Sequence, residues 1–93
     1  MSDKETPNNK ETLIEFPAHI AVKAMGLHTD DFQQLISSLV LPHVHPQEAT
    51  LTTLPSKGGK YISVSVRFTA ESLEQLHAVY GALKSEPRVL YTL

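Results

Sequence analysis

The sequence contains no cysteine and no tryptophan, and neither sign of charge dominates it. Without cysteine, the chain cannot form disulfides, use a thiolate as a nucleophile or bind zinc through sulfur. Eight basic and ten acidic side chains leave a formal net charge of -2, which creates no positive field to attract nucleic acid. The N-terminus lacks a basic-then-apolar signal pattern, and no apolar run approaches the roughly 20 residues of a membrane span. These absences favour a cytoplasmic protein with no membrane partner.

The length and the distribution of apolar residues predict one small domain. Residues 1–12 are polar and aperiodic, which is typical of a flexible N-terminal tail. Residues 13–93 are predicted to form the single domain, and its short apolar cluster at residues 13–17 is expected to fold back on the edge of the core. A tail of this kind concentrates the apolar side chains, 41% of the whole sequence, in the remainder.

The clearest pattern lies at residues 61–68, where large apolar side chains alternate with hydroxyl-bearing and basic ones. A period of two predicts a strand with Ile62, Val64, Val66 and Phe68 on its buried face. The glycine-rich turn at residues 56–60 predicts a hairpin that joins this strand to another at residues 49–54, because glycine readily adopts a positive φ.

Two amphipathic helices are predicted on either side of this hairpin. The apolar stripe of the first has the spacing i, i+3, i+4, i+7 and i+8, at Phe32, Leu35, Ile36, Leu39 and Val40. We expect Thr29 or Asp30 to cap this helix and Pro42 to end it. The second helix is expected to begin at a Thr69 cap and to end before Pro87. Its predicted buried stripe consists of Leu73, Leu76, Tyr80 and Leu83.

Strands at residues 19–25 and 88–93 complete a βαββαβ order, which predicts an α+β, ferredoxin-like two-layer sandwich. Its four-stranded antiparallel sheet carries both helices on one face, and its first and third strands are central. In the last strand, Val89, Tyr91 and Leu93 are predicted to face the core. The opposite, open face is predicted to carry Lys23, Met25, Thr50, Thr52, Tyr61, Ser63, Ser65, Arg67, Arg88 and Leu90.

Short blocks at residues 13–17 (LIEFP), 23–26 (KAMG), 56–58 (SKG) and 61–66 (YISVSV) resemble the bacterial YbeD-like family. The resemblance runs from about residue 13 to residue 93, and it implies a fold similar to the ACT regulatory domains. It also implies, by analogy, small-molecule binding and pairing into dimers, and a regulatory role near lipoate metabolism has been suggested for the namesake of the family. Residues 25–29 (MGLHT) lack the Asp-x-Pro-Gly type of ligand loop, which argues against amino-acid binding.

No catalytic or metal site is predicted. His43 and His45, with Glu48 nearby, lie in a proline-bounded loop that offers no third ligand in a fixed geometry, so exposed loop histidines are the preferred interpretation. No nucleophile and base occur in a known local arrangement. We therefore expect a protein that is not an enzyme and has no cofactor.

The turn before the third strand is a candidate anion site. Its residues Ser56, Lys57, Gly58 and Lys60 offer backbone amides and two ammonium groups. A strand follows the turn rather than a helix, so it is not a Walker-type loop. The preferred interpretation is a structural hairpin kept hydrophilic by its lysines.

The open face is the main candidate for function. We predict a ligand or partner surface made of Lys23, Met25, Gly26, Tyr61, Ser63, Ser65 and Arg67. The leading hypothesis is a non-enzymatic regulatory or adaptor domain whose partner is a second copy or a metabolic enzyme, with a small-molecule ligand left open. The alternative is an anion or single-stranded RNA bound through this face and the turn, although only Tyr61 is available to stack on bases. A merely solvated face is an equally good interpretation.

Overall fold

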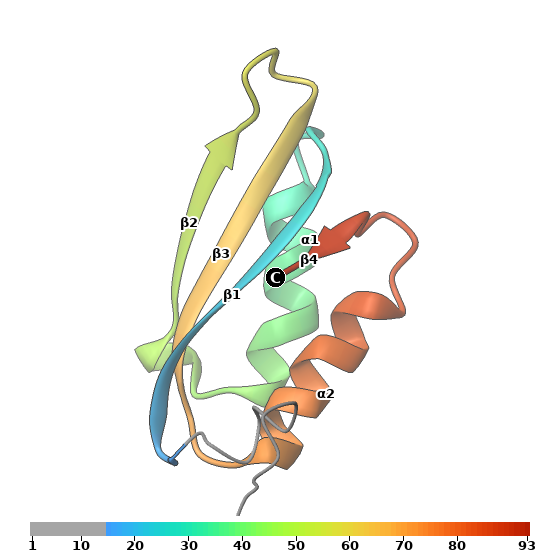
Figure 1. The fold of residues 1–93 in the computed structure, drawn as a ribbon. Helices are drawn as coiled ribbons and strands as arrows, with labels where there is room; N and C mark the ends of the chain where they lie inside the picture. Colours follow the sequence, from blue (N-terminus) through green and yellow to red (C-terminus); the bar gives the residue numbers. More distant parts are fainter. Residues whose placement is uncertain (1–14) are drawn as a thin grey trace, which may run out of the picture.

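A computed structural model describes residues 15–93, so the predicted tail and the first two residues of the predicted domain lie outside the described part. The elements follow one another as predicted (Figure 1): β1 (Ala18–Leu27), α1 (Phe32–Val40), β2 (Thr50–Pro55), β3 (Tyr61–Ala70), α2 (Leu73–Lys84) and β4 (Tyr91–Thr92). Two short 3-10 turns, η2 (Leu41–His43) and η3 (Pro46–Glu48), connect α1 to β2.

The four strands form one antiparallel sheet in the order β2-β3-β1-β4, and both helices lie on the same side of it (Figure 1). The predicted ferredoxin-like arrangement is therefore confirmed, with β1 and β3 at the centre. These two strands pair over ten residues each, from Ala18 opposite Ala70 to Leu27 opposite Tyr61. Both strands are longer than the alternation alone predicted.

The core lies between the sheet and the helices. Val22 and Ala24 of β1 and Val64 and Val66 of β3 are buried on the side that faces the helices. The helices contribute the fully buried side chains Phe32, Ile36, Val40, Val79 and Leu83. Burial of each large aliphatic or aromatic side chain contributes about 1.5–3 kcal/mol, and this contact holds the two layers together. Phe16 also packs against the core, as expected for the cluster at residues 13–17, of which residues 13 and 14 are not described.

The second helix begins later than the sequence suggested. β3 continues through Thr69 to Ala70, so Thr69 cannot cap α2. The cap is Ser72, whose hydroxyl oxygen accepts a hydrogen bond from the Gln75 amide at 3.1 Å. Val79 is fully buried, whereas Tyr80 is only partly buried; desolvation raises the pKa of the Tyr80 hydroxyl above its ordinary value.

The N-terminus of α1 is fixed by Arg88, which the sequence had placed on the open face. The N-cap residue is Asp31, not Thr29 or Asp30, and its carboxylate accepts hydrogen bonds from Arg88 Nη1 (3.1 Å) and Nη2 (2.8 Å). Nη2 also donates to Thr29 Oγ1 at 2.6 Å. The guanidinium hydrogen bonds, with one from Thr29, lower the pKa of Asp31 well below its ordinary value. Arg88 thus joins the chain before β4 to the start of α1, and the prediction that it lies on the open face is wrong.

The alternation predicted for the last strand is also wrong. Residues 86–89 form a turn, in which the Val89 amide donates to the Glu86 carbonyl at 3.0 Å, so extended structure begins only after it. Val89 packs against the core as predicted. In β4, however, Tyr91 lies opposite Met25 and Thr92 opposite Ala24. Paired residues share a face of the sheet, so Tyr91 is on the open face and Thr92 faces the helices.

Candidate functional site

The strand register places an apolar row across the open face, the sheet surface that faces away from the helices. Reading across the sheet from β2 to β4, the row consists of Leu54, Ser63, Met25 and Tyr91. Leu27, which lies opposite Tyr61, adds a further apolar side chain at the end of the central strands. Three of these side chains, Leu27, Leu54 and Tyr91, are more than half exposed, and Leu54 reaches 69%.

Leu93 extends this surface on the β4 side. Its backbone exchanges two hydrogen bonds with Lys23, at 3.0 and 2.9 Å, so it lies beside Lys23 on the same face, and its side chain is exposed. We call the side chains of Met25, Leu27, Leu54, Tyr91 and Leu93 the apolar band. Large exposed apolar side chains that gather on one face are typical of an interaction surface, whereas isolated ones are not informative.

Of the predicted surface residues, the structure brings Met25 and Ser63 into the apolar row and leaves Gly26 outside it. Ser63 is only 9% exposed between its larger neighbours, so it forms the floor of the surface rather than its top. Gly26 is buried, and a Cβ atom there would lie 2.5 Å from both the Arg88 carbonyl oxygen and Phe32 Cε1. Gly26 therefore makes room for the chain before β4 and for α1.

Lys23 lies in the next row, between Leu93 and Ser65, with Thr52 beyond Ser65. Its side chain is half-buried and has no acidic partner within residues 15–93. A lysine side chain beside an apolar surface and without a carboxylate nearby is a natural contact for an acidic group of another molecule, because covering the surface would partly desolvate and so strengthen the pair.

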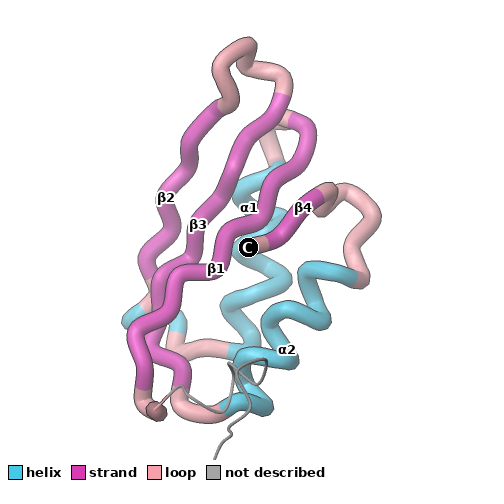
Figure 2. The backbone as a smooth tube through the Cα atoms, viewed as in Figure 1, coloured by secondary structure: helices cyan, strands magenta, loops and turns pink. Residues whose placement is uncertain are grey.

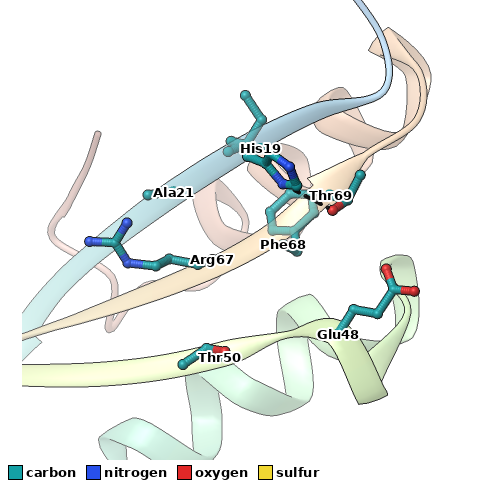
Figure 3. Close-up of a pocket in the computed structure, with 8 residues that line it drawn as sticks. His19, Ala21, Glu48, Thr50, Arg67, Phe68 and Thr69 are labelled. Atoms are coloured by element: carbon teal, nitrogen blue, oxygen red, sulfur yellow. Dashed lines mark hydrogen bonds between the residues drawn. The ribbon is translucent and has the colours of Figure 1, made fainter.

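Near the start of β1 and the end of β3, the open face contains a hollow (Figure 3). The hollow has a volume of about 370 Å³, and its polar lining comes from His19, Glu48, Thr50, Arg67 and Thr69. Ala21 lies opposite Arg67 in the register, and its small side chain leaves the space open.

The charged groups of the hollow do not neutralise each other. Thr69 Oγ1 and His19 Nδ1 are 3.3 Å apart, the only hydrogen bond between side chains that line the hollow. Figure 3 shows Arg67 and Glu48 at opposite ends, and Arg67 has no acidic partner in the described part of the chain. The hollow therefore offers the Arg67 guanidinium and the hydroxyl groups of Thr50 and Thr69 to a small polar ligand, with the Glu48 carboxylate at its other end.

The turn at residues 56–60 uses most of its polar groups to close the hairpin. Ser56 donates its amide to the Tyr61 carbonyl (2.8 Å), and its hydroxyl oxygen accepts from the Tyr61 amide (3.0 Å). The Gly59 amide, at a residue with φ of 79°, donates to the Ser56 carbonyl (2.9 Å). Lys60 lies 5.5 Å from the centre of the Tyr61 ring, and Lys57 is exposed. The hairpin accounts for Ser56 and Gly59 without a ligand.

The histidines of the η2–η3 segment do not converge on a common point. His45 Nε2 lies 3.2 Å from Glu71 Oε2, and residues 15–93 contain no group of three His, Asp or Glu side chains that could hold a metal ion. No helix of the described chain has both the length and the apolar character to cross a membrane.

Sequence reasoning missed Leu27, Leu54, Tyr91 and Leu93. Leu54 could have been found, because it continues the alternation of Thr50 and Thr52, which were placed on the open face. Tyr91 and Leu93 could not, because the turn at residues 86–89 changes which residues of the last strand face outward.

Comparison with known proteins gives a family but no activity. A family model described as "Protein of unknown function (DUF493)" matches residues 11–93. A UPF0250 protein of Janthinobacterium sp. (strain Marseille) is 41% identical over 85 residues, which cover 89% of this chain and 92% of that protein. A UPF0250 protein of Ralstonia nicotianae is 39% identical over 87 residues, with 90% and 88% covered.

The fold is also similar to a solved structure, the solution structure of protein HP0495 from H. pylori. The TM-score is 0.71 at 16% sequence identity, and the match covers 99% of this chain and 98% of that one. At this identity the similarity concerns the fold alone. The matches in sequence confirm the predicted resemblance to YbeD-like proteins, and this chain belongs to the DUF493 family, together with the bacterial UPF0250 proteins.

Proposed function

We propose that this chain is a non-enzymatic adaptor or regulatory domain that binds another protein on the open face of its sheet. The observation that carries the proposal is the apolar band, which crosses the face from Leu54 on β2 to Tyr91 and Leu93 on β4. Burial of such side chains is the main driving force of protein association, at roughly 25 cal/mol per Å² of apolar surface.

The side chains of the open face indicate what kind of partner surface would be complementary to it. Lys23 lies next to the apolar band and has no acidic partner within residues 15–93. A complementary surface would be apolar, with a carboxylate opposite Lys23, since charge complementarity fixes orientation and excludes wrong partners. The family resemblance makes an enzyme of lipoate metabolism the first partner to test.

The test compares three forms of the protein as immobilised baits: wild type, Lys23→Glu and Lys57→Glu. Both variants reverse one lysine charge, but Lys57 is in the hairpin turn, outside the paired rows of the sheet that carry the apolar band. A partner captured from a bacterial lysate and identified by mass spectrometry should be lost with Lys23→Glu and retained with Lys57→Glu. The purified pair should then show the same order of affinities by calorimetry.

A second variant checks the apolar part of the contact. Leu54→Ser removes the most exposed apolar side chain of the band and should weaken the same complex about tenfold or more, since burial of a leucine side chain contributes about 1.5–3 kcal/mol. Binding that is unaffected by both Lys23→Glu and Leu54→Ser would refute the proposal. Loss with Lys57→Glu alone would instead assign the contact to the hairpin.

A second candidate function is supported by the hollow around Arg67. We infer that a small anion could bind there, because the guanidinium has no acidic partner in residues 15–93 and Thr50 and Thr69 offer hydroxyl groups beside it. Titration of the protein with inorganic phosphate should shift the amide resonances of Arg67 and its neighbours in NMR spectra. Arg67→Gln should abolish these shifts, and Lys84→Gln on α2 is the matched control.

A further inference from the structure

β1 is covered along its whole length on one side only. Its ten residues all pair with β3, but on the other side β4 pairs only with Ala24 and Met25, and Leu93 adds hydrogen bonds to Lys23. Residues 18–22 therefore have no strand beside them on that side within the described chain. Figure 2 shows β4 beside the upper part of β1 only.

The hydrogen bonds to β4 identify which backbone groups of β1 are unpaired. Lys23 and Met25 direct their backbone groups toward β4: Lys23 donates to and accepts from Leu93, and Met25 accepts from Leu90 at 2.8 Å. Backbone groups in an antiparallel strand point alternately to its two neighbours. His19 and Ala21 continue this row, so their N–H and C=O groups point out of the sheet.

This edge also lacks the features that normally keep sheet edges from pairing. Such features are lysine, proline, a bulge or an inward-pointing charge. Residues 18–22 read Ala-His-Ile-Ala-Val, with a regular register to β3 and no lysine or proline. An open, regular edge of this kind is a template for another strand.

We propose that the edge of β1 pairs with the same edge of a second copy, antiparallel and around a two-fold axis that passes next to Ile20. In this register His19 lies opposite Ala21 of the second copy, and Ala21 lies opposite His19 of the second copy. Each of these two pairs exchanges both backbone hydrogen bonds, which gives about four in total. The inference goes beyond the proposed function, because it concerns the edge of the sheet and not the surface that would bind a partner protein.

The neighbouring registers are excluded because they require backbone groups that are already hydrogen-bonded or an N–H group that is absent. A register with Ala21 opposite Ala21 of the second copy would require His19 to pair with Lys23, whose backbone groups are already hydrogen-bonded to Leu93. A register with His19 opposite His19 of the second copy would require Ala21 to pair with Pro17, which has no N–H. Only the register centred on Ile20 uses both unpaired residues of each copy.

The bend of the chain before β1 and the side chains along the edge suit this arrangement. The chain bends at Phe16 and Pro17, so the strand of the second copy would end at Ala18, before it meets Leu93. On the helix side, Ile20 would contact its own copy, and Val22 would contact Ala18. On the open side, His19 faces the small, neutral Ala21, so no like charges lie directly opposite each other. The two open faces would then lie on the same side of one continuous sheet.

A single cysteine tests the axis directly, because the natural sequence contains none. In the proposed register Ile20 forms a pair without hydrogen bonds with its own copy, with Cα atoms about 4.5 Å apart, within the range of a disulfide. Under mild oxidation Ile20→Cys should form a covalent dimer, seen on non-reducing gels and by intact mass. Thr53→Cys is the control, because Thr53 lies on β2 at the opposite edge of the sheet and is more exposed than Ile20. If cross-links formed only by random collision, Thr53→Cys would form them at least as fast as Ile20→Cys.

A second pair of variants tests the hydrogen bonds. Ala21→Pro removes one outward N–H from each copy, and thus two of the about four proposed bonds, without touching the bonds to β3. It should weaken the dimer at least about tenfold in sedimentation velocity, whereas Ala21→Thr, which keeps the N–H, should stay within about threefold.

Three results would overturn the inference. The first is a wild-type protein that remains monomeric up to about 1 mM, near the weakest affinity such measurements detect. The second is cross-linking of Thr53→Cys as fast as that of Ile20→Cys. The third is a monomeric wild-type protein that captures another protein, if Ala21→Pro abolishes that capture. The edge of β1 would then pair with a strand of a different protein and not with a second copy. Lys23→Glu should leave the dimer intact, so failure of the proposed function and failure of this inference can be told apart.

Discussion

Replacement of Gly26 by alanine should destabilise the fold without affecting any side chain of the open face. The added Cβ would lie 2.5 Å from both the Arg88 carbonyl oxygen and Phe32 Cε1, about 1 Å or more inside a normal van der Waals contact of about 3.5–4.0 Å. Neither neighbour can move freely, since Phe32 is fully buried and the oxygen belongs to the backbone. Overpacking of a tight core typically costs about 1–3 kcal/mol, and two rigid neighbours place this site at the upper end, near 3 kcal/mol.

Urea unfolding followed by circular dichroism measures this effect, and a second glycine provides the control. A loss of about 3 kcal/mol corresponds to a fall of roughly 12–24 °C in melting temperature for a chain of this size. Gly81 lies inside α2, and apart from its chain neighbours and the backbone of its own helix no atom lies within 4 Å of an added Cβ. Gly81→Ala should therefore raise the free energy of unfolding by about 0.5–1 kcal/mol, because alanine loses less backbone entropy than glycine on folding. If Gly26→Ala unfolded within 0.5 kcal/mol of the wild type (about the spread of neutral substitutions), the packing argument would be refuted.

Two further predictions concern the helix starts. Arg88 lowers the pKa of Asp31 below its ordinary value of 3.8, so the carboxylate stabilises the fold above about pH 4, and this contribution is lost as the pH falls further. The difference in unfolding free energy between wild type and Asp31→Asn should therefore be smaller at pH 2.5 than at pH 7. An unchanged difference would contradict the ion pair between Arg88 and Asp31. Asp30→Asn is the control. Ser72→Ala should cost about 1 kcal/mol through loss of the cap on α2. An equal or larger loss in Thr69→Ala, measured in the same urea titration, would argue that the cap is misassigned.

The two proposals would give the domain two separate contact regions. The apolar band lies on the face of the sheet, and the free edge of β1 lies at its side. If both are used, a dimer would present two copies of the band on one continuous surface and could bind two sites of a symmetric partner with increased avidity.

The sequence determined the elements and the side of the sheet that forms the core. Alternation at residues 61–68 and the apolar spacing at residues 32–40 depend only on the geometry of a strand and of a helix, which local sequence carries. The βαββαβ order then left few arrangements, because crossover connections are right-handed. The fold class and the central position of β1 and β3 were predicted for this reason.

The tertiary structure decided which residues occupy the edges and the ends of these elements. Arg88 reads locally as a strand residue, and only the approach of α1 turns it toward Asp31. Tyr91 is on the open face because a turn stabilised by the Val89 amide shifts the alternation. Gly26 serves to admit Phe32 and the chain before β4, a contact between segments far apart in the sequence. Such contacts depend on where distant segments meet in space, which no local periodicity records.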